Sequence, residues 1–483
     1  MAIVEQWELR AEFARRLSAL YGEEVPAYQA LLDVAQSVNR DVLSRQGADA
    51  ERLGSIKRVS AERHGAIRFG TPAEMAQVAR IFAAMGMYPV GFYDLREAAA
   101  SAVPVVSTAF RPVDDGELAR SPFRVFASML VPSDRRFFTA DLQRRLETFL
   151  RSRHLFCAEL LRLADRAATY QGLHPDDTEL FLVLATASFK LSSEPVDRAW
   201  YEELHAVSSV AADIGAVTRT HINHLTPRVL DIDELYRRMS ARGIEMIDDI
   251  QGPPRWEGPD LLLRQTSFRA LAERRVFREA DGRITSGDLR VRFGEVEARG
   301  IAVTPAGRAL YDELTIETEQ AIRAASSGRL TIQERDSIAA GIWRNRVPGS
   351  EKDLAAYDLA YFTYRVDEDR KPWRQPPGNT LSDLLDQNWV IAQPIVYEDF
   401  LPKSAAGIFQ SNLTSEGHKD GAQPTTEIDA GWMEGVLDRQ LHDPHDLYAS
   451  IRRRPLATVA ARLGIRGEIE IPTTATATEG HLQ

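Results

Sequence analysis

The chain has 483 residues, 44% of them hydrophobic, which is enough for a large decorated domain with a substantial core. Its 59 lysines and arginines against 70 aspartates and glutamates give a net charge of −11, which argues against a nucleic-acid-binding surface. No run of about 18 apolar residues occurs, so we expect no membrane span, and the charged N-terminus is unlike a signal peptide. The single cysteine, Cys157, excludes an internal disulfide framework and favours a reducing, cytoplasmic location.

The N-terminal segment, residues 1–60, predicts helices. Apolar residues at helical spacing indicate two amphipathic helices within residues 3–46. The second of these helices is expected to begin at Pro26, because proline suits the first helical position. We assign this segment a packing role and no chemistry.

Residues 61–132 predict a first β-α-β-β-β unit. A short strand follows His64, and a capping box of Thr71 and Glu74 predicts the start of a helix. Three further strands are expected at 87–93, 103–112 and 123–131. The pattern from 133 to 215 is helical, so we expect a helical insertion after this unit.

Residues 216–305 predict a second unit with the same layout. A strand containing His224 precedes a helix cap at Asp231, and further strands are expected at 244–250, 261–271 and 289–305. Residues 306–465 predict additional helices and strands, and the tail at 466–483 is expected to be flexible. The fold class is therefore α+β, in one decorated domain over residues 1–483.

The two units share their spacing as well as their order of elements. Placing His64 on His224 puts Arg68 on Arg228, each four residues after its histidine, and aligns the two helix caps. Further along, the tetrapeptides TAFR (108–111) and TSFR (266–269) also match. This agreement over several elements indicates a duplicated unit.

Duplication predicts a shared site. Where two such units join around one cavity, equivalent first-strand positions face each other, so His64 and His224 should converge on one metal ion. The same alignment places Ser128 opposite Glu295, and serine is the poorer ligand. Two histidines and one carboxylate with open positions are the ligand set of non-haem Fe(II) oxygenases.

The residues alone leave alternatives open. A histidine in a strand is usually an ordinary core or surface residue, and a strand arginine such as Arg68 can be a surface residue rather than a carboxylate clamp. Glu295 and Glu297 lie two residues apart and share one strand face, so either could face the cavity. His221 and His224 point to opposite faces, and the repeat favours His224.

Nine segments together resemble the 2-oxoadipate dioxygenase/decarboxylase family, long treated as a domain of unknown function. They are ERHGAIRFGT, MGMYPVGFYDL, STAFRP, PFRVF, HINHLTPR, LDID, LLRQTSF, RFGEVEARGIAVTP and YEDFLPKSAAGIFQSNL. The resemblance covers about residues 5 to 450. It implies a fold related to the vicinal oxygen chelate superfamily, a metal-binding cavity between the two units, and chemistry like that of hydroxymandelate synthase.

The resemblance also implies a ligand set and a reaction. Fe(2+) would be held by His64, His224 and Glu295, with Glu295 preferred over Glu297. The reaction would convert 2-oxoadipate and O2 into D-2-hydroxyglutarate and CO2, a step of lysine degradation. The partners would be this small 2-oxo acid and O2, with no nucleic acid or membrane involved.

The substrate contacts implied by the resemblance are His64, His224, Arg68 and Lys403. Arg68 would bind a substrate carboxylate and so serve catalysis, while Lys403 would contact the substrate through its backbone. Lys403 departs from the family pattern, which has valine at this position. Two other readings remain: another metal-dependent enzyme of the same fold, such as an extradiol dioxygenase or a glyoxalase-type isomerase, or a non-enzymatic helical interaction protein.

Overall fold

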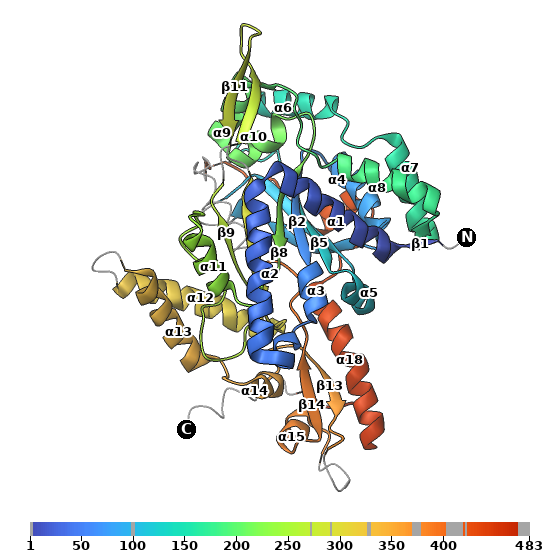
Figure 1. Ribbon diagram of the computed structural model, residues 1–483, viewed down its shortest axis with the longest axis vertical. Helices are drawn as coiled ribbons and strands as arrows, with labels where there is room; N and C mark the ends of the chain where they lie inside the picture. The colour runs from blue at the N-terminus through green and yellow to red at the C-terminus, as the bar shows by residue number, and fades with distance from the viewer. Residues whose placement is uncertain are drawn as a thin grey trace.

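The computed structural model describes residues 3–97, 102–270, 273–289, 292–325, 330–369, 378–401, 419–420 and 423–471. Its five-stranded mixed sheet has the order β3-β4-β5-β2-β8, and Figure 1 labels β5, β2 and β8 near its centre. The strands are β2 (Arg63–Phe69), β3 (Tyr88–Asp94), β4 (Val105–Arg111), β5 (Phe123–Leu130) and β8 (Ile222–Pro227). Only β8 comes from the predicted second unit, so the two units meet at the antiparallel pair of β2 and β8.

The row of strands continues beyond β8. Strand β12 (Gly294–Arg299) lies beside β8, where the Val229 amide donates a 2.8 Å hydrogen bond to the carbonyl of Glu297. Strand β9 (Leu263–Phe268) then pairs antiparallel with β12. Strands β2 and β8 therefore lie at the centre of the row, with β5 and β4 on one side and β12 and β9 on the other.

The pairing of β2 with β8 is symmetric about its centre. His64 pairs with Thr226, Gly65 with Leu225 and Ala66 with His224, so each histidine is opposite the residue two positions after the other. This symmetry agrees with the predicted alignment of the two histidines.

The alignment of the last strands is wrong by two residues. Arg68 pairs with Ser128 on β5, whereas Arg228, its counterpart, pairs with Glu297 on β12. Ser128 therefore corresponds to Glu297, and Phe126, rather than Ser128, corresponds to Glu295. Strand β10 (Glu273–Arg278) and strand β11 (Ile284–Leu289) form a hairpin between β9 and β12, which makes spacing along the chain a poor guide to register.

The helix after each first strand begins where the caps predict. Helix α4 (Pro72–Ala83) starts at a capping box of Thr71 and Glu74, and helix α11 (Ile232–Ala241) starts where the Asp231 side chain accepts a hydrogen bond from the Glu234 amide. Both helices contribute buried apolar residues to the cluster that covers the sheet.

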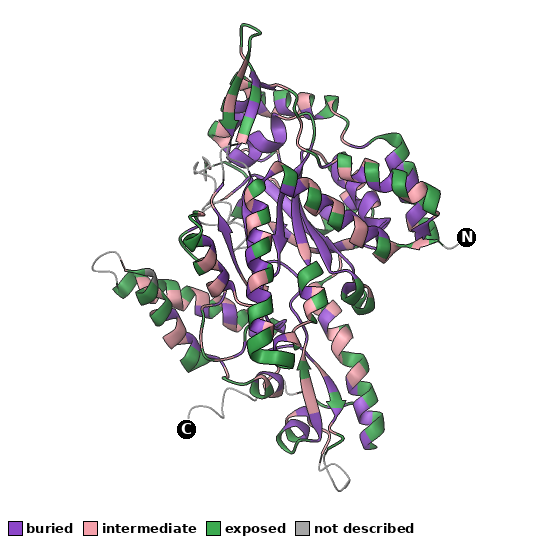
Figure 2. Ribbon diagram, viewed as in Figure 1, coloured by how far each residue is buried: buried purple, intermediate pink, exposed green. Residues whose placement is uncertain are grey.

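The two predicted N-terminal helices are present, and they cover the central strands (Figure 1). Helix α1 (Gln6–Glu24) packs Phe13 on Phe123, and its Tyr21 hydroxyl donates hydrogen bonds to the carbonyls of Asn223 and Phe293. Helix α2 (Pro26–Gln46) follows at once, and the strands beneath both helices are buried (Figure 2). Short helices η1 (Gly47–Glu51) and α3 (Ile56–Ala61) lead into β2.

The second unit is less regular than predicted. Residues 244–250 form no strand, and a single isolated bridge in this stretch joins Met246 to Phe268 of β9. The first unit also contains an unpredicted helix, α5 (Asp115–Arg120), and a short helix, η2 (Leu95–Glu97).

The predicted helical insertion is present in the structure. It contains α6 (Ala140–Ser152), α7 (Ala158–Tyr170), α8 (Pro175–Ala187), α9 (Arg198–Val207) and α10 (Ser209–Gly215). Two-residue strands tie it to the core: β6 (Gly172–Leu173) pairs with β1 (Val4–Glu5), and β7 (Val196–Asp197) pairs with β10. Every residue of α10 is buried, so this last helix lies inside the molecule.

Most of the C-terminal additions share a separate apolar cluster, but Met433 and Leu437 belong to the cluster that covers the sheet. The elements of these additions are α12 (Pro305–Ala325), α13 (Ile332–Arg346), α14 (Glu351–Ala356), β13 (Phe362–Val366), α15 (Leu381–Asp386), β14 (Val390–Pro394), α17 (Ala430–Leu437) and α18 (Pro444–Leu463). The expected tail boundary at 466 is too early, because Ile469 is buried and Glu470 pairs with Thr380. None of the helices in the described ranges has the length and apolarity needed to cross a bilayer.

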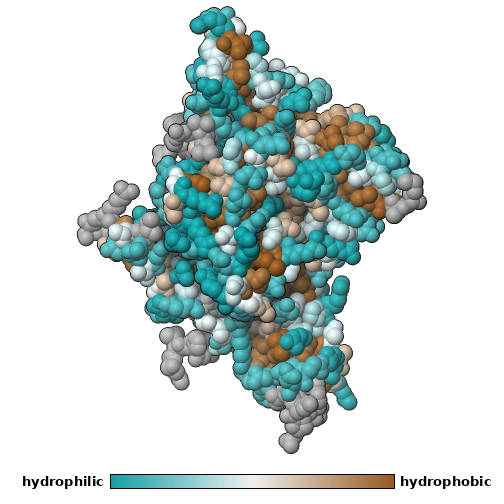
Figure 3. Space-filling model, in the orientation of Figure 1, coloured by the Kyte–Doolittle hydropathy of each residue, from teal (hydrophilic) through white to brown (hydrophobic). Residues whose placement is uncertain are grey.

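The face of the molecule seen in Figure 3 is mostly hydrophilic and carries only scattered apolar areas. The unusual polar groups of this protein are the charged side chains buried in its interior. Histidines, glutamates and arginines are buried around β2, β8 and β12. Burying charged groups is costly unless they are paired or bind an ion, so this interior region is the candidate functional site.

Candidate metal centre

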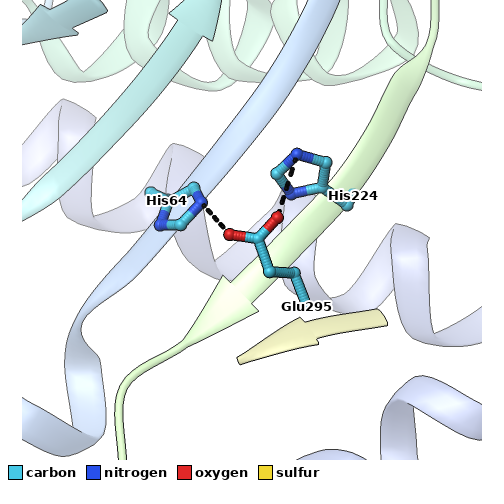
Figure 4. Close-up of side chains that lie close together, drawn as sticks. All are labelled: His64, His224 and Glu295. Atoms are coloured by element: carbon cyan, nitrogen blue, oxygen red, sulfur yellow. Dashed lines mark ion pairs between the residues drawn. The ribbon is translucent and has the colours of Figure 1, made fainter. Parts of the chain in front are cut away.

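Three side chains from three strands converge inside the protein. His64 on β2, His224 on β8 and Glu295 on β12 each offer a ligand atom, and these atoms lie within 4.8 Å of one another (Figure 4). The Nε2 atom of His64 is 3.2 Å from Oε1 of Glu295, and Nε2 of His224 is 3.7 Å from Oε2 of the same carboxylate. The structure thus brings together the three residues for which the sequence suggested a metal.

The neighbouring histidine belongs to a different cluster. A register irregularity in the β2–β8 pairing skips Asn223, so Ala66 pairs with His224 and Ile67 with Ile222. His221 precedes this stretch, and its Nε2 atom lies 3.3 Å from Asp213 rather than near Glu295. The structure therefore places His224, and not His221, beside the other two candidate ligands.

The protonation states of the three candidate ligands are compatible with a bound cation. Burial would lower the pKa of His64, but Glu297 and Glu295 outweigh burial and raise it. Burial, together with the positive charges of His64 and Arg68, lowers the pKa of His224 well below its usual value. Burial raises the pKa of Glu295. A bound metal ion would stabilise Glu295 as a carboxylate and both histidines as neutral imidazoles, since all three groups could coordinate it.

The second ring nitrogen of each histidine lies close to an oxygen atom. Nδ1 of His64 lies 2.9 Å from Oε2 of Glu297, and Nδ1 of His224 lies 3.1 Å from the Thr226 hydroxyl. A carboxylate beside Nδ1 favours the tautomer with a proton on that atom, which leaves the Nε2 lone pair for a metal. Sequence reasoning treated Glu297 only as a competitor of Glu295 and missed this supporting position.

Behind Glu297 lies a buried network of arginines and glutamates. Arg299 donates to Glu297 at 2.6 Å, and Arg124 reaches Glu62 at 2.7 Å and also pairs with Glu398. These arginines lower the pKa of Glu297, against burial, which would raise it, so that carboxylate stays ionised. The network links β12 to the chain just before residue 400, and no motif in the sequence signalled it.

Aromatic rings pack against both histidines of the cluster. The ring centroids of His64 and Phe400 are 5.0 Å apart, and Phe400 lies 5.1 Å from Phe126. Phe293 stacks on His224 at 5.4 Å. Such rings exclude water and lower the local dielectric constant, which strengthens the electrostatic interactions between the candidate ligands and an ion or a substrate.

Arg68 is buried on the same strand as His64, and its Nη1 atom donates a 2.5 Å hydrogen bond to Asp213. Its charge contributes to the lowered pKa of His224, so the guanidinium is close enough to act on the cluster. Lys403, for which we expected a backbone contact to substrate, lies outside the described residues.

Fold and site together define a class: an α+β protein with a buried two-histidine, one-carboxylate cluster suited to a metal ion. The chain belongs to the 2-oxoadipate dioxygenase/decarboxylase family, whose model matches residues 13–412. It is 52% identical over 444 residues to the 2-oxoadipate dioxygenase/decarboxylase of Mycobacterium bovis, covering 92% of this chain and 96% of that one. Identity to the Pseudomonas putida enzyme of the same name is 40%, over 95% and 97% of the two chains.

Solved structures agree with this assignment. The hydroxyglutarate synthase of Pseudomonas putida, in complex with 2-oxoadipate, superposes with a TM-score of 0.80 at 36% identity, covering 96% of this chain and 99% of that one. A Shigella flexneri protein without an assigned function superposes with a TM-score of 0.77 at 35% identity, over 94% and 99% of the chains. The family expected from the sequence motifs is therefore confirmed.

Proposed function

We propose that this protein is an Fe(II)-dependent 2-oxoadipate dioxygenase/decarboxylase that forms D-2-hydroxyglutarate. The reaction balances as 2-oxoadipate plus O2 giving 2-hydroxyglutarate plus CO2. The observation that carries the proposal is the buried cluster of His64, His224 and Glu295 in a chain 52% identical to a protein of that name. The D configuration of the product rests on the family resemblance alone.

The donor set favours Fe(II) over the harder cations. Magnesium and calcium prefer shells made of oxygen atoms, whereas two imidazoles and one carboxylate suit iron and leave positions open. When bound, iron would supply the activation of O2 and a site for the 2-oxo acid group. His64, His224 and Glu295 would hold it, and Glu297 would keep the proton of His64 on Nδ1, away from the ligand atom Nε2.

Substrate binding is assigned to Arg68 and the residues around the cluster. A guanidinium binds a carboxylate through paired, charge-assisted hydrogen bonds, so Arg68 would hold the distal carboxylate of 2-oxoadipate and fix its orientation. The rings of Phe126, Phe293 and Phe400 would keep bulk water away from the reacting end. We also retain the proposal that Lys403 contacts the substrate through its backbone.

We further propose that residues 61–132 and 216–305 are two related units of a core like that of the vicinal oxygen chelate superfamily, within one decorated domain. The symmetric pairing of β2 with β8 and the matching helix starts support this proposal. In such a core the metal lies where the first strands of the two units meet.

The test is anaerobic loading with Fe(II), followed by measurement of oxygen uptake and CO2 release with 2-oxo acids of different chain length. We expect turnover with 2-oxoadipate, one CO2 per O2, and 2-hydroxyglutarate as the product. Metal uptake with no turnover of any 2-oxo acid would favour another metal-dependent enzyme of this fold. A stable protein that takes up no iron, manganese, cobalt or zinc would favour a non-enzymatic interaction protein.

A matched pair of variants tests the ligand assignment. His224→Ala should lose bound iron, whereas His221→Ala should retain it, because His221 lies beside Asp213 and away from Glu295. Iron content is measured by metal analysis after removal of unbound ion. The reverse result would overturn the assignment of His224.

A further inference from the structure

The carboxylate of Asp213 lies at the centre of a second buried cluster. It belongs to α10, the last helix of the insertion, and is 5% exposed. Its Oδ2 atom accepts hydrogen bonds from Nη1 of Arg68 at 2.5 Å and from Nδ2 of Asn223 at 2.9 Å. Its Oδ1 atom lies 3.3 Å from Nε2 of His221. One side chain from the helical insertion thus touches residues of both central strands.

The charge of this carboxylate is well defined. Burial would raise the pKa of Asp213, but His221 and Arg68 outweigh that effect and lower it, so the group is anionic at neutral pH. The contact with Arg68 is shielded from solvent on both sides, since the two side chains are 4% and 3% exposed. Its Coulombic attraction is therefore screened less than that of a surface ion pair, and losing one partner would leave an uncompensated buried charge.

Arg68 needs such a partner if it is to select a substrate. An arginine side chain has several rotatable bonds, and fixing them before the ligand arrives lowers the entropic cost of binding. A guanidinium carries five N–H donors, so it can contact a protein carboxylate and a ligand carboxylate together. The backbone is held as well, because the Thr220 hydroxyl donates a 2.7 Å hydrogen bond to the carbonyl of Arg68.

We propose that Asp213 is a positioning residue that orients Arg68 toward the distal carboxylate of the substrate and so sets the preference for a dicarboxylic 2-oxo acid of defined length. The proposal rests on the function proposed above for Arg68. It also gives the helical insertion a role, because α10 delivers the carboxylate from a point 145 residues along the chain. Asn223 joins this cluster to the metal centre, since it precedes His224 directly on β8.

The experiment compares two substrates that differ only at the distal end. Asp213→Asn, Arg68→Ala and the parent protein are loaded with Fe(II) and assayed with 2-oxoadipate and with 2-oxohexanoate, which has a methyl group in place of the distal carboxylate. Binding of both acids is also measured anaerobically by calorimetry. For Asp213→Asn we expect KM and Kd for 2-oxoadipate to rise about tenfold to a hundredfold, with 2-oxohexanoate changed less than about twofold.

Asp134→Asn is the matched control, because Asp134 is equally buried and paired with Arg96 and Arg136. We expect Asp134→Asn to leave the ratio of kcat/KM for 2-oxoadipate and 2-oxohexanoate unchanged. If Asp213→Asn does not accumulate as folded protein, Asp213→Glu replaces it, and a carboxylate one methylene longer should alter the ratio of kcat/KM for 2-oxoadipate and 2-oxoglutarate at least about threefold.

The outcomes separate the inference from the function on which it rests. If Arg68→Ala does not discriminate between the two substrates, Arg68 is not the clamp and the proposed binding role fails. If Arg68→Ala weakens the binding of 2-oxoadipate more than that of 2-oxohexanoate, but Asp213→Asn weakens the binding of both acids equally or of neither, the positioning role alone is overturned. Discrimination by both variants, with unchanged iron content, supports the proposal.

Discussion

The two halves of the core place different residues at equivalent positions. In the second unit, β12 presents Glu295 to the histidines and Glu297 to the Nδ1 atom of His64. In the first unit, the corresponding positions on β5 are Phe126, which packs on Phe400, and Ser128, which accepts a hydrogen bond from Ser107. At these positions one half therefore presents two carboxylates, while the other presents an aromatic ring and a hydroxyl group.

The arginines that follow the two histidines differ in the same way. Arg68 pairs with Asp213 from the helical insertion, whereas Arg228 pairs with Glu62 at 3.0 Å and donates to the carbonyl of Leu53. Arg228 is part of the buried network behind the metal centre, while Arg68 lies near enough to lower the pKa of His224. The comparison indicates that one repeated sequence position serves structure in the second unit and, under the function proposed above, substrate binding in the first.

Substitution of Glu295 on β12 is the strongest test of this difference between the two units. We expect Glu295→Ala to reduce bound iron to near zero and activity by more than about a thousandfold, because one of three proposed ligands is lost. Phe126→Leu, at the corresponding position on β5, should retain iron. Metal analysis and oxygen uptake measure both effects, and full iron occupancy in Glu295→Ala would show that the ligand set is wrong.

The second pair compares Glu297 with its counterpart Ser128. Glu297→Gln keeps the shape of the side chain but removes the charge beside Nδ1 of His64, and we expect metal affinity to fall about tenfold to a hundredfold. Ser128→Ala should change it by less than about twofold. The affinities come from competition with a chelator, and equal effects of the two changes would contradict the asymmetry.

The third pair compares the two arginines by stability and selectivity. Arg228→Lys removes the planar fork from a buried network, so we expect a loss of about 2 to 4 kcal/mol in unfolding free energy with unchanged preference between 2-oxoadipate and 2-oxohexanoate. Arg68→Lys should instead weaken 2-oxoadipate selectively. Denaturant unfolding and substrate kinetics distinguish the cases, and a change in selectivity from Arg228→Lys would break the comparison.

Local signals in the sequence predicted most of the helices and the relation of the two histidines. Caps such as Thr71 and Asp231 act over three residues, so their helix starts could be located without tertiary structure. The register of β12 could not be derived in this way, because a hairpin between β9 and β12 removes the link between chain spacing and pairing. Glu295 nevertheless lies beside both histidines, since an error of two residues keeps a side chain on the same strand face.

The partners of the buried arginines could not be predicted from the sequence. Asp213 lies 145 residues from Arg68, in a helical insertion to which the sequence assigned no role. Glu62 and Glu398 lie far apart in the chain and meet the same arginine, Arg124. No local pattern marks a residue as the partner of a buried charge, because the pairing depends on how the strands and the insertion come together.

The smallest effect concerns the buried network itself and appears in acid. Burial would raise the pKa of Glu398, but Arg58 and Arg124 outweigh burial and lower it to about 2. Because the folded pKa lies below the unfolded value of about 4.3, this group stabilises the fold above that value, and the contribution is lost as the pH falls toward the folded pKa. From this group we expect unfolding free energy, measured with denaturant on metal-free protein, to fall by about 1.5 kcal/mol between about pH 5 and about pH 3.

Glu398→Gln separates this contribution from general acid sensitivity. The variant should be less stable at neutral pH, because Arg58 and Arg124 lose a charged partner, but its stability should fall less steeply over the same pH interval. Phe126→Leu, the control variant of the first pair, leaves Glu398, Arg58 and Arg124 unchanged. Its unfolding free energy should therefore fall between about pH 5 and about pH 3 as steeply as that of the parent protein. If the unfolding free energies of Glu398→Gln and the parent protein fell equally steeply with pH, the arginines would not hold this carboxylate ionised.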